Sequence, residues 1–552
     1  MKITVIGGYG VFGGRLVQLL RRDGHEVTVA GRDLARAQRF ASAWGAQAMV
    51  LDRSADLSPL TGAEVVVDAA GPFHAYGDDP YRLARFCIDV GINYLDLSDN
   101  AAFCAGISVL DANARKASVF ALSGVSSVPA LSAAAATALA QDMETIDTIS
   151  SAILPGNRAP RGRSVVDSIL SQTGLMFDQT TDSQTTPVRS WSAPRTFTLP
   201  SGELRKGWLI EVPDQSLFPA HFKARSVQFR AGLELPVMNY GLAVLSRLRE
   251  RLRFGMPRWL VALVMFGACL LAPFGTDRGG MVVAVIGRKD GAWQRAVWRL
   301  GVDQGEGPFI PAVPARALLR NPAQIALGAR PALGDVTLPD AEAAMADLCV
   351  TTTRDTTQIT PLFPATLGAP FATLAPEIRA THDTPAPRIW QGRASVTRGA
   401  GVLPRLAAFL FRFPQARDDT RVQVTKTPVN GTEVWQRRFG TATFQSTLRA
   451  TPQGITERFG AFMFLLNLHV AEGRLHYPIQ KGWCLGIPIP RFALPKSAAS
   501  ERVENGRFHF DVRLSMPVTG QLIVHYQGWL QSAADFSGTP LAVETERQPE
   551  LI

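Results

Sequence analysis

The first residues that could do chemistry are glycines near the amino terminus. Gly7 and Gly8 follow the β-favouring run ITVI, and Gly10 and Gly13 complete the spacing G-x-G-x-x-G. In such a turn the backbone can approach a pyrophosphate, and the helix that follows offers free N–H groups and a partial positive charge. The pattern therefore predicts a phosphate-binding turn made by Gly7, Gly8, Gly10, Val11, Phe12 and Gly13.

The residues around these glycines predict a strand, a turn and a helix. Leu16, Leu19 and Leu20 share one face of the expected helix, and Gly24 ends it. A second strand, at residues 26–31, comes at the distance expected for a βαβ unit. This context favours a nucleotide site over the alternative, which is a tight turn of an α/β domain that binds no ligand.

The end of the second strand distinguishes between the two nicotinamide cofactors. Domains that bind NAD typically have Asp or Glu there for the ribose hydroxyls, but this chain has Gly31 and Arg32. A guanidinium suits a 2′-phosphate, so we expect NADP(H) to be favoured over NAD(H); the alternative is a solvated surface arginine. Asp33 is expected to cap the next helix. Asp52, at the end of the third strand, is a candidate contact on the adenine side or a helix cap.

Apolar runs at residues 46–52, 64–73, 93–99 and 118–124 continue the alternation of strands and helices. Runs of this kind suit strands that are buried on both faces of a sheet. We therefore expect residues 1–125 to form a Rossmann-type α/β domain, a doubly wound, six-stranded parallel sheet with helices on both sides.

After the fourth and fifth expected strands, the sequence resembles the saccharopine dehydrogenase-like NADP-binding proteins. The motifs that carry the resemblance are AGPF at residues 70–73, Tyr76-Gly77, and Tyr94 with Asp96 two residues later. The resemblance implies an NADP(H)-dependent oxidoreductase, and it extends less sharply into the next domain. It also implies that Ala69, Ala70, Gly71 and Pro72 lie over the nicotinamide half of the cofactor, where Gly71 permits close approach of the backbone.

Candidates for proton transfer are Tyr76, Tyr94 and Asp96, at strand ends that should face the cleft. The alternative role for Tyr94 and Asp96 is structural support of the turn. The family that the motifs resemble usually has an acidic residue at the place of Asn100, so we assign no proton-transfer role to that position. No Tyr-x-x-x-Lys pair follows the fourth strand, which disfavours the mechanism of the short-chain reductases.

A stretch in the middle of the chain, residues 259–275, has no charged residue and follows five arginines between Arg247 and Arg258. Pro273 should end its helix, which leaves about 14 residues or about 21 Å, short for a bilayer. Three interpretations compete: a helix at a membrane surface, a short spanning helix, and a helix buried in a dimer or between domains. Because a domain resumes after this stretch, we favour contact of residues 247–275 with a membrane surface.

We expect three further parts of the chain: an α+β substrate or lid domain at residues 126–350, a Thr- and Pro-rich linker at 351–375, and a β-rich domain at 376–535. In the last part, polar and apolar residues alternate between glycine-containing turns, which predicts an antiparallel sheet. It resembles a domain of unknown function that commonly follows saccharopine dehydrogenase-like reductases. A curved sheet with inward aromatic side chains can enclose an apolar ligand; a packed sandwich core is the alternative.

Charged residues recur in the motifs of this last domain. The set comprises Glu433, Trp435, Arg437, Arg438, Glu457, Arg458, Arg491, Glu501 and Arg507. If they converge inside the sheet, they mark a polar site. The alternative is a set of solvated faces with exposed ion pairs that contribute little.

Composition narrows the classes of partner. The net charge of +10 fits nucleic acid, an anionic membrane or phosphate-bearing ligands, but basic and aromatic residues are not interleaved as in nucleic-acid-binding proteins. The five cysteines and eight histidines, among them His469 and His476, lack the spacing of disulfide frameworks or metal sites. We expect no nucleic acid and no metal, and a cytoplasmic protein that is peripheral at the membrane where residues 247–275 bind it.

Together these features predict an NADP(H)-dependent oxidoreductase that acts on a small hydrophobic or lipid-like substrate, with a homodimer as one assembly to test. The alternative is a non-catalytic protein that binds a nucleotide and a lipid. A third interpretation, a membrane-tethered scaffold, depends only on the stretch that begins at Arg247. Neither the substrate nor the direction of the reaction follows from the residues.

Overall fold

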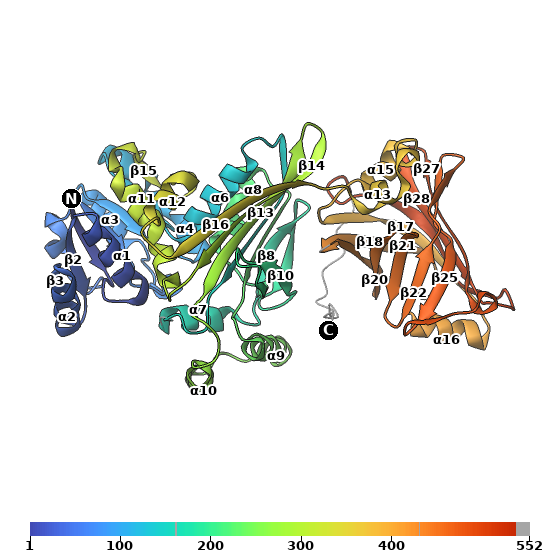
Figure 1. The fold of residues 1–552 in the computed structure, drawn as a ribbon, viewed down its shortest axis with the longest axis horizontal. Coiled ribbons are helices and arrows are strands. Elements are labelled where there is room, and N and C mark those ends of the chain that lie inside the picture. Colours follow the sequence, from blue (N-terminus) through green and yellow to red (C-terminus); the bar gives the residue numbers. More distant parts are fainter. Residues whose placement is uncertain (161–162, 430, 537–552) are drawn as a thin grey trace.

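The computed structural model describes residues 1–160, 163–429 and 431–536, and three sheets follow one another along its longest axis (Figure 1). The first sheet contains the amino terminus, the second lies in the middle, and the third lies at the far end. A two-stranded ribbon, β8 (Met176–Thr181) with β9 (Gln184–Arg189), accompanies the second sheet.

The first sheet has seven parallel strands in the order β15-β6-β5-β4-β1-β2-β3. Its strands are β1 (Lys2–Ile6), β2 (Glu26–Gly31), β3 (Gln47–Val50), β4 (Val65–Asp68), β5 (Asn93–Asp96), β6 (Phe120–Ser123) and β15 (Gly328–Pro331). The order confirms the predicted Rossmann-type α/β domain. The expected number of six strands is corrected to seven, because β15 returns from a distant segment and places Gly328 opposite Phe120 of β6.

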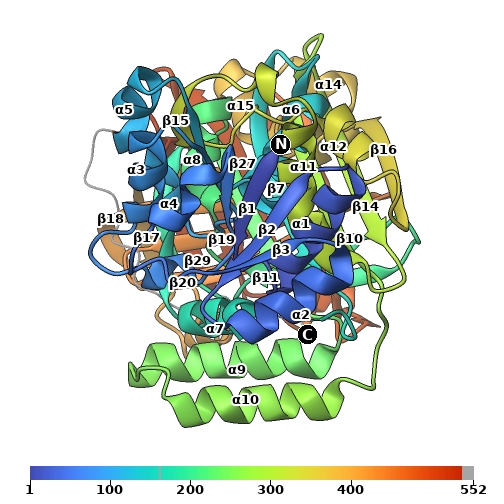
Figure 2. The same ribbon diagram turned by 90° about the vertical axis from the view of Figure 1, so that its left-hand side faces the viewer.

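Helices cover both faces of the first sheet (Figure 2). They are α1 (Val11–Arg22), α2 (Leu34–Trp44), α3 (Arg82–Asp89), α4 (Ala101–Gly106) and α5 (Asp111–Lys116). Outside them, α11 (Val313–Arg320) packs against α1 and α12 (Leu338–Ala344), and α6 (Ser132–Ala140) packs against α12 and against β13 and β14 of the second sheet. Leu16, Leu19 and Leu20 of α1 are fully buried, as their shared helical face predicted. All residues of β4 are buried as well, which explains why an unbroken apolar run forms this strand.

The second sheet is mixed, in the order β10-β11-β12-β7-β13-β14-β16, with β12 and β7 parallel and the other pairs antiparallel. Its strands are β7 (Thr145–Leu154), β10 (Arg195–Thr198), β11 (Leu204–Leu209), β12 (Ser226–Ala231), β13 (Gly279–Lys289), β14 (Ala292–Val302) and β16 (Val350–Gln358). The accompanying helices are α7 (Arg163–Gln172), α8 (Pro213–Phe222), α9 (Pro236–Leu252) and α10 (Arg258–Leu271). Helices α6 and α8 lie between the first and second sheets (Figure 1).

Much of the expected linker at residues 351–375 has regular structure. Residues up to Gln358 belong to β16, which pairs with β14, and α13 (Leu362–Leu367), α14 (Ala369–Ala372) and α15 (Pro376–His382) follow. The threonines explain the strand, because β-branched side chains favour extended backbone. Most of β16 is exposed at the edge of the sheet, so no apolar alternation marked it in the sequence.

The third sheet has thirteen strands, and their antiparallel pairing confirms the predicted β-rich domain. They are β17 (Arg388–Arg398), β18 (Arg417–Val429), β19 (Thr432–Phe439), β20 (Ala442–Thr451), β21 (Gly454–Phe459), β22 (Phe462–Leu466), β23 (His469–Ala471), β24 (Arg474–His476), β25 (Ile479–Cys484), β26 (Ile487–Pro488), β27 (Lys496–Glu504), β28 (Arg507–Ser515) and β29 (Leu522–Ser532). One helix, α16 (Val402–Leu410), lies at the lower end of this domain in Figure 1.

Polar contacts join the second sheet to the third. Arg388 of β17 donates from Nη1 to Asp147 Oδ1 of β7 over 3.0 Å, and the backbone N–H of Ile389 donates to Asp182 over 2.9 Å. Trp293 Nε1 donates to the carbonyl of Asp383 over 3.1 Å. These contacts hold the end of β17 against the middle sheet.

A buried ion cluster holds the returning segment against the first domain. Arg316 of α11 donates from Nε and Nη2 to the two carboxylate oxygens of Asp23, each over 2.8 Å, and it also pairs with Asp347. Its side chain is 3% exposed, whereas that of Arg320, which also contacts Asp23, is 34% exposed. Arg316 therefore joins the end of α1 to α11 and to the residues after α12.

Substitution of this arginine should destabilise the protein. We expect Arg316→Ala to lower the free energy of unfolding by about 3 kcal/mol, because two acidic side chains lose a buried partner. Arg320→Ala, a matched control on the same helix, should cost less than about 1 kcal/mol because its ion pair is partly solvated. Urea unfolding followed by near-UV circular dichroism measures both values, and equal losses would contradict the role assigned to Arg316.

Candidate functional site

The predicted glycine turn packs its backbone against the end of β4. Gly7 has φ +72°, and a Cβ there would lie 2.8 Å from the Cα of Ala70 and 2.9 Å from the carbonyl oxygen of Ala69. A Cβ on Gly13 would lie 2.4 Å from the carbonyl oxygen of Gly7. Gly10 is the residue before the first turn of α1, so the free amides of the helix begin at this turn. The structure thus brings the residues 7–13 and 69–72 together at the carboxyl end of the sheet.

The end of β2 leaves one arginine available for a ligand. Arg32 is exposed, and within the described residues its side chain has no hydrogen bond or ion pair. Gly31 beside it is covered by Tyr9, because a Cβ at Gly31 would lie 2.4 Å from the tyrosine ring. Asp33 caps α2, as predicted, by accepting a hydrogen bond from the N–H of Arg36 over 3.0 Å.

Asp52 follows β3 at the same edge of the sheet. It accepts hydrogen bonds from the N–H and the hydroxyl of Ser54, over 2.9 and 2.5 Å, and these bonds lower the pKa of its carboxyl. Residues 52–57 are not helical, so Asp52 closes a turn and does not cap a helix. Its contact with an adenine stays a prediction.

Tyr76 lies beside a buried carboxyl that the sequence analysis missed. The Tyr76 hydroxyl donates to Asp68, the last residue of β4, at 3.2 Å from Oδ1 and 3.1 Å from Oδ2. Asp68 is fully buried, and burial raises its pKa although the N–H of Ala70 also donates to it. A charged residue that ends the apolar run VVVD was the signal for this site in the sequence.

Asp96 is the neighbour of Asp68 on the next strand, and the two residues pair in register. Its Oδ1 accepts hydrogen bonds from the N–H of Ser98, the hydroxyl of Ser123 and the N–H of Gly124, over 3.0, 2.9 and 2.8 Å. Its Oδ2 is buried and has no partner among the described residues. Burial raises the pKa of Asp96 to about 7, so this carboxyl can hold a proton near neutral pH.

Tyr94 lies deeper than the other two candidates. Its side chain is 1% exposed and packs in the apolar cluster that includes Ile88 and Ala121. Burial raises the pKa of its hydroxyl well above the ordinary value. This packing favours the alternative role of Tyr94, support of the strand.

A third buried carboxyl comes from the second domain. Asp214, near the start of α8, is fully buried and accepts a hydrogen bond from the Ser151 hydroxyl over 3.4 Å. Burial raises its pKa to about 7, and its Oδ1 has no partner in the described part of the chain. No spacing in the sequence singled it out, because its neighbours come from other elements.

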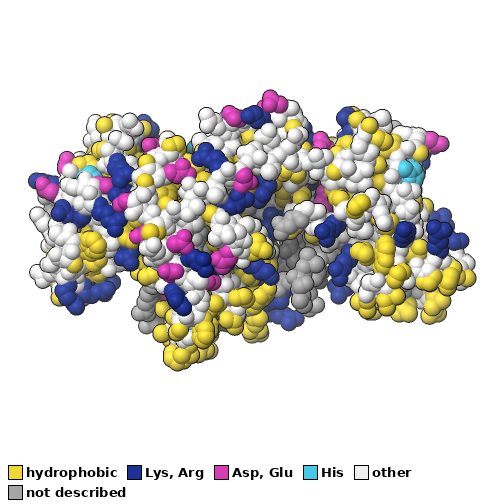
Figure 3. Space-filling model, viewed as in Figure 1, with side chains coloured by type: hydrophobic (Ala, Val, Ile, Leu, Met, Phe, Trp, Pro, Cys, Tyr) yellow, Lys and Arg dark blue, Asp and Glu magenta, His cyan; other side chains and the backbone are white. Residues whose placement is uncertain are grey.

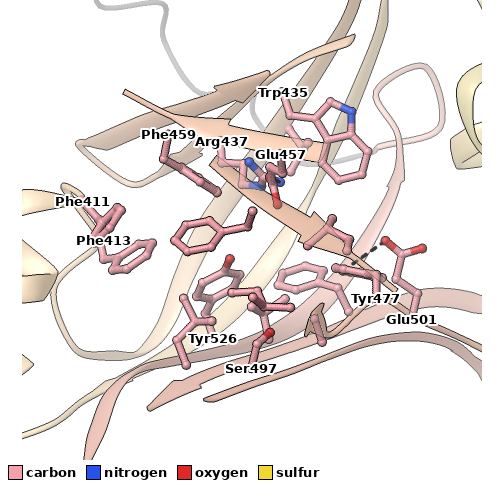
Figure 4. Close-up of a pocket in the computed structure, with 18 of the residues that line it drawn as sticks. Phe411, Phe413, Trp435, Arg437, Glu457, Phe459, Tyr477, Ser497, Glu501 and Tyr526 are labelled. Carbon is pink, nitrogen blue, oxygen red and sulfur yellow. Dashed lines mark hydrogen bonds and ion pairs between the residues drawn. The ribbon is translucent and has the colours of Figure 1, made fainter. Parts of the chain in front are cut away.

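The third domain brings together part of the charged set. Trp435, Arg437, Glu457 and Glu501 line the cavity inside the curved sheet (Figure 4), and the buried Glu433 accepts a hydrogen bond from Trp435 Nε1 over 2.7 Å. The side chains of Arg438 and Arg458 instead donate to turn carbonyls, and Arg491 and Arg507 are exposed. The inner members therefore form a polar site, whereas the other four do not belong to it.

The apolar stretch forms the second helix of an exposed pair. α10 has the 14 residues predicted, and Trp259, Leu263, Phe266 and Leu270 are each 57% exposed or more. α9 beside it (Figure 2) exposes Val237, Val244 and Leu252. The interpretation as a helix buried between domains is thus wrong for this face. Among the described residues, no helix is long and apolar enough to cross a membrane.

Two family models match parts of the chain. Residues 3–139 match the saccharopine dehydrogenase NADP-binding domain, and residues 374–530 match DUF4166, a domain of unknown function. These matches confirm both resemblances that the sequence motifs carried. The first of them supports an oxidoreductase that binds NADP(H). No curated protein matches the chain.

Solved structures of two dehydrogenases are similar to much of the chain. Saccharopine dehydrogenase (L-glutamate forming) from Saccharomyces cerevisiae has 13% identity and a TM-score of 0.46, over 64% of this chain and 99% of that chain. A probable dehydrogenase from Thermotoga maritima has 11% identity and a TM-score of 0.32, over 62% of this chain and 93% of that chain.

The raised pKa of Asp96 predicts a pH effect on stability. Because the folded-state pKa lies above that of an unfolded chain, the folded state binds more protons between about pH 4 and 7, and stability falls as pH rises through this window. Asp96→Asn can keep an oxygen acceptor at the Oδ1 position but carries no charge. We expect the variant to lose less stability than the wild type between pH 5 and 8, measured by thermal unfolding; parallel curves would contradict this assignment.

Proposed function

We propose that this protein is an NADP(H)-dependent oxidoreductase that acts on a hydrophobic, lipid-like substrate. The observation that carries the proposal is the arrangement at one edge of the first sheet. There the glycine turn, the exposed Arg32 and the Asp68–Tyr76 pair lie at the carboxyl ends of neighbouring strands. Ligands of open α/β sheets bind at this edge, near the point where the strand order reverses.

The residues present fit a dinucleotide phosphate. The backbone of residues 7–13 packs so closely that a side chain at Gly7 or Gly13 would collide with backbone atoms, which leaves a compact turn of the kind that approaches a pyrophosphate, and the start of α1 offers amides to it. Arg32 would hold the 2′-phosphate, and residues 69–72 would lie over the nicotinamide. NADP(H), when bound there, supplies or accepts a hydride.

Tyr76 is the residue that we assign to proton transfer. Burial and the neighbouring Asp68 raise the pKa of its hydroxyl, which keeps the phenol protonated at neutral pH. Because burial also raises the pKa of Asp68, this carboxyl would carry a proton and pass it to the Tyr76 oxygen while the phenol gives its own proton to a carbonyl oxygen as a hydride reaches the carbon. Asp68 would position Tyr76, and Asp96 would support the turn beside it.

The exposed helix pair suggests how a lipid-like substrate is reached. α9 and α10 present apolar stripes along one side of the molecule, and Arg247, Arg251 and Arg253 are exposed at the connection between them. Apolar residues with flanking arginines suit the interface of an anionic membrane. We propose that residues 247–275 bind such a surface, and that a homodimer formed through the same helices is the competing arrangement.

A non-catalytic nucleotide- and lipid-binding protein is the second candidate function. It is favoured by the cavity in the third domain, which lies far from the first sheet (Figure 1). Oxidation of NADPH by the purified protein with a long-chain aldehyde or ketone would exclude it. Tight binding of apolar ligands without turnover of any carbonyl compound would favour it.

Cofactor preference tests the nucleotide site. We expect NADPH to bind at least about tenfold more tightly than NADH, because a guanidinium pairs strongly with the 2′-phosphate. Arg32→Ala should remove this preference and leave NADH binding nearly unchanged. Fluorescence of the bound nicotinamide during titration gives both dissociation constants.

Two variants serve as controls in that titration. Arg39→Ala removes another exposed arginine of α2 and should change neither constant. Gly10→Val should abolish binding of both cofactors while the fold persists, because a Cβ at Gly10 meets a single atom, the Gly7 carbonyl oxygen, at 3.0 Å. Unchanged binding in Gly10→Val would refute the site, and absence of binding in the wild type would leave the turn a structural element.

Membrane contact is tested by flotation with vesicles of phosphatidylglycerol and phosphatidylcholine. The double variant Leu263→Glu/Phe266→Glu should lower the bound fraction by about fivefold or more, because two charges enter the apolar stripe of α10. Leu34→Glu/Val109→Glu changes two exposed apolar residues of the first domain and should bind like the wild type. A wild-type dimer that floats with neither vesicle and becomes monomeric in the α10 variant would favour the homodimer instead.

A further inference from the structure

The third sheet curls around a cavity with about 110 Å³ of free space. One water molecule needs about 10–15 Å³ on this measure, so the space exceeds that of a few waters. Strands from both ends of the sheet line it, including β17, β18, β21, β22, β27, β28 and β29. This cavity and the nucleotide-binding edge lie in domains at opposite ends of the molecule (Figure 1), so the inference drawn here does not rest on the proposed reductase activity.

One end of the cavity is aromatic and aliphatic. Phe411, Phe413 and Phe459 lie there in Figure 4, and Phe464, Leu466 and Ile523 are further apolar residues of the lining. Phe411 contacts Phe413 with ring centroids 5.6 Å apart and Phe459 at 6.3 Å. Such walls bind hydrocarbon and offer no partner for a polar group.

The rest of the cavity wall holds charged side chains that already have partners. Arg437 donates to Glu457 over 3.0 Å and to the hydroxyl of Ser446 over 2.8 Å. Glu501 lies 2.7 Å from Nε2 of His382, and Lys426 donates to a backbone carbonyl over 2.8 Å. A charged ligand would have to break these pairs inside a buried site, which is costly.

Two buried donors in the cavity wall have no such partner. Nε1 of Trp390 forms no hydrogen bond in the described residues, and the side chain is 8% exposed. The Tyr526 hydroxyl likewise has no hydrogen-bond partner among the described residues, is 7% exposed, and points into the cavity in Figure 4. Nε1 of Trp390 is closed off from the free space, whereas the Tyr526 hydroxyl borders it, so the hydroxyl favours a ligand that carries an oxygen acceptor.

We propose that this cavity binds an uncharged amphiphile with one hydrocarbon chain and a hydroxyl or carbonyl group, such as a long-chain alcohol. The hydrocarbon chain of the ligand lies against Phe411 and its aromatic neighbours, and the ligand's oxygen accepts a hydrogen bond from Tyr526. The Arg437–Glu457 pair remains intact beneath the polar group. The site therefore selects an alcohol or an ester over a carboxylate of the same length.

The exposed surface next to the cavity shows where the ligand enters. α16 leads directly into Phe411 of the cavity wall, and its outer face exposes Val402, Leu406 and Phe409 at 80%, 62% and 80%. Phe411 also packs against Phe462, the first residue of β22. The turn that precedes β22 accepts a hydrogen bond from the backbone N–H of the exposed Leu485. Hydrophobic side chains thus run from the surface into the cavity.

This apolar surface and the α9–α10 pair face the same side of the molecule, along the lower edge in Figure 3. Arg405 is exposed on α16 itself, as Arg247 and Arg251 are on α9. Two separated apolar patches with cationic borders on one side suit a single flat anionic bilayer. We infer that the ligand passes from the membrane into the cavity at α16.

Displacement of a fluorescent probe tests the site in the full chain. N-phenyl-1-naphthylamine should bind, and oleyl alcohol should displace it at a concentration about tenfold or more below that required for oleate. Tyr526→Phe should lower the affinity for oleyl alcohol several-fold without changing the affinity for the probe. Displacement by oleate at equal or lower concentration would overturn the proposed ligand class.

A matched pair of variants on β27 tests the position of the ligand. Ala499→Trp places a large ring in the cavity and should abolish probe binding, whereas Ala498→Trp places the same ring on the exposed side of the strand and should not. Far-UV and near-UV circular dichroism spectra that match those of the wild type show that the third sheet is folded in both variants. Equal probe binding in the two variants would overturn the site.

Transfer from vesicles tests the entry route. Leu406→Glu/Phe409→Glu should slow the transfer of vesicle-borne probe at least about tenfold, because the charged helix no longer enters the bilayer. The equilibrium affinity of this double variant for dissolved probe should equal that of the wild type. Unchanged transfer would contradict entry at α16, and loss of affinity for dissolved probe would assign α16 to the site itself.

Discussion

The carbonyl oxygen of Gly7 occupies the space where a side chain on residue 13 would have to lie, and the Gly7 backbone in turn presses against Ala69 and Ala70. These contacts between backbones set the start of α1 against the end of β4. Everything at this edge of the first sheet depends on them, because the direction of the helix amides and the path of residues 69–72 are fixed together. A site of this kind tolerates variation in its loops but not in its glycines.

The same edge concentrates buried acidic groups. Asp68 and Asp96 end adjacent strands, and the burial that an α/β sheet imposes on its strands raises the pKa of both. An apolar residue at a purely structural strand end would make the folded state more stable, because an isolated buried carboxylate raises its free energy. Perturbed carboxyls that gather beside a cofactor site are therefore a physical argument for chemistry at this position.

The sequence predicted features that depend on local order and missed those that depend on distant neighbours. The glycine turn, the Asp33 cap and the length of α10 follow from adjacent residues, and Pro273 sufficed to place the end of that helix. β15 was not predictable in this way, because GARP gains its strand conformation from pairing with β6.

In the third sheet, too, local sequence predicts one aspect of side-chain direction and distant neighbours decide the other. Alternation required Arg437 and Arg438 to face opposite sides, but only the curvature of the sheet decides which of them is inside. Arg437 faces the cavity and Arg438 bends to a turn carbonyl. In the same way, the pairing of Tyr76 with Asp68 needed two segments whose spacing in the chain carries no pattern.

The return of the chain to β15 also limits how the parts of the molecule can move. Six strands of the second sheet lie in the chain between β6 and β15, and its edge strand β16 follows β15, so the chain passes between the first and second domains at several points, one of them braced by Arg316. A single connection would leave the second domain free to rotate about many axes, whereas several separate crossings and the Arg316 brace restrict that motion. Closure of the second domain over a dinucleotide would then be limited to the movements that all of these attachments allow together.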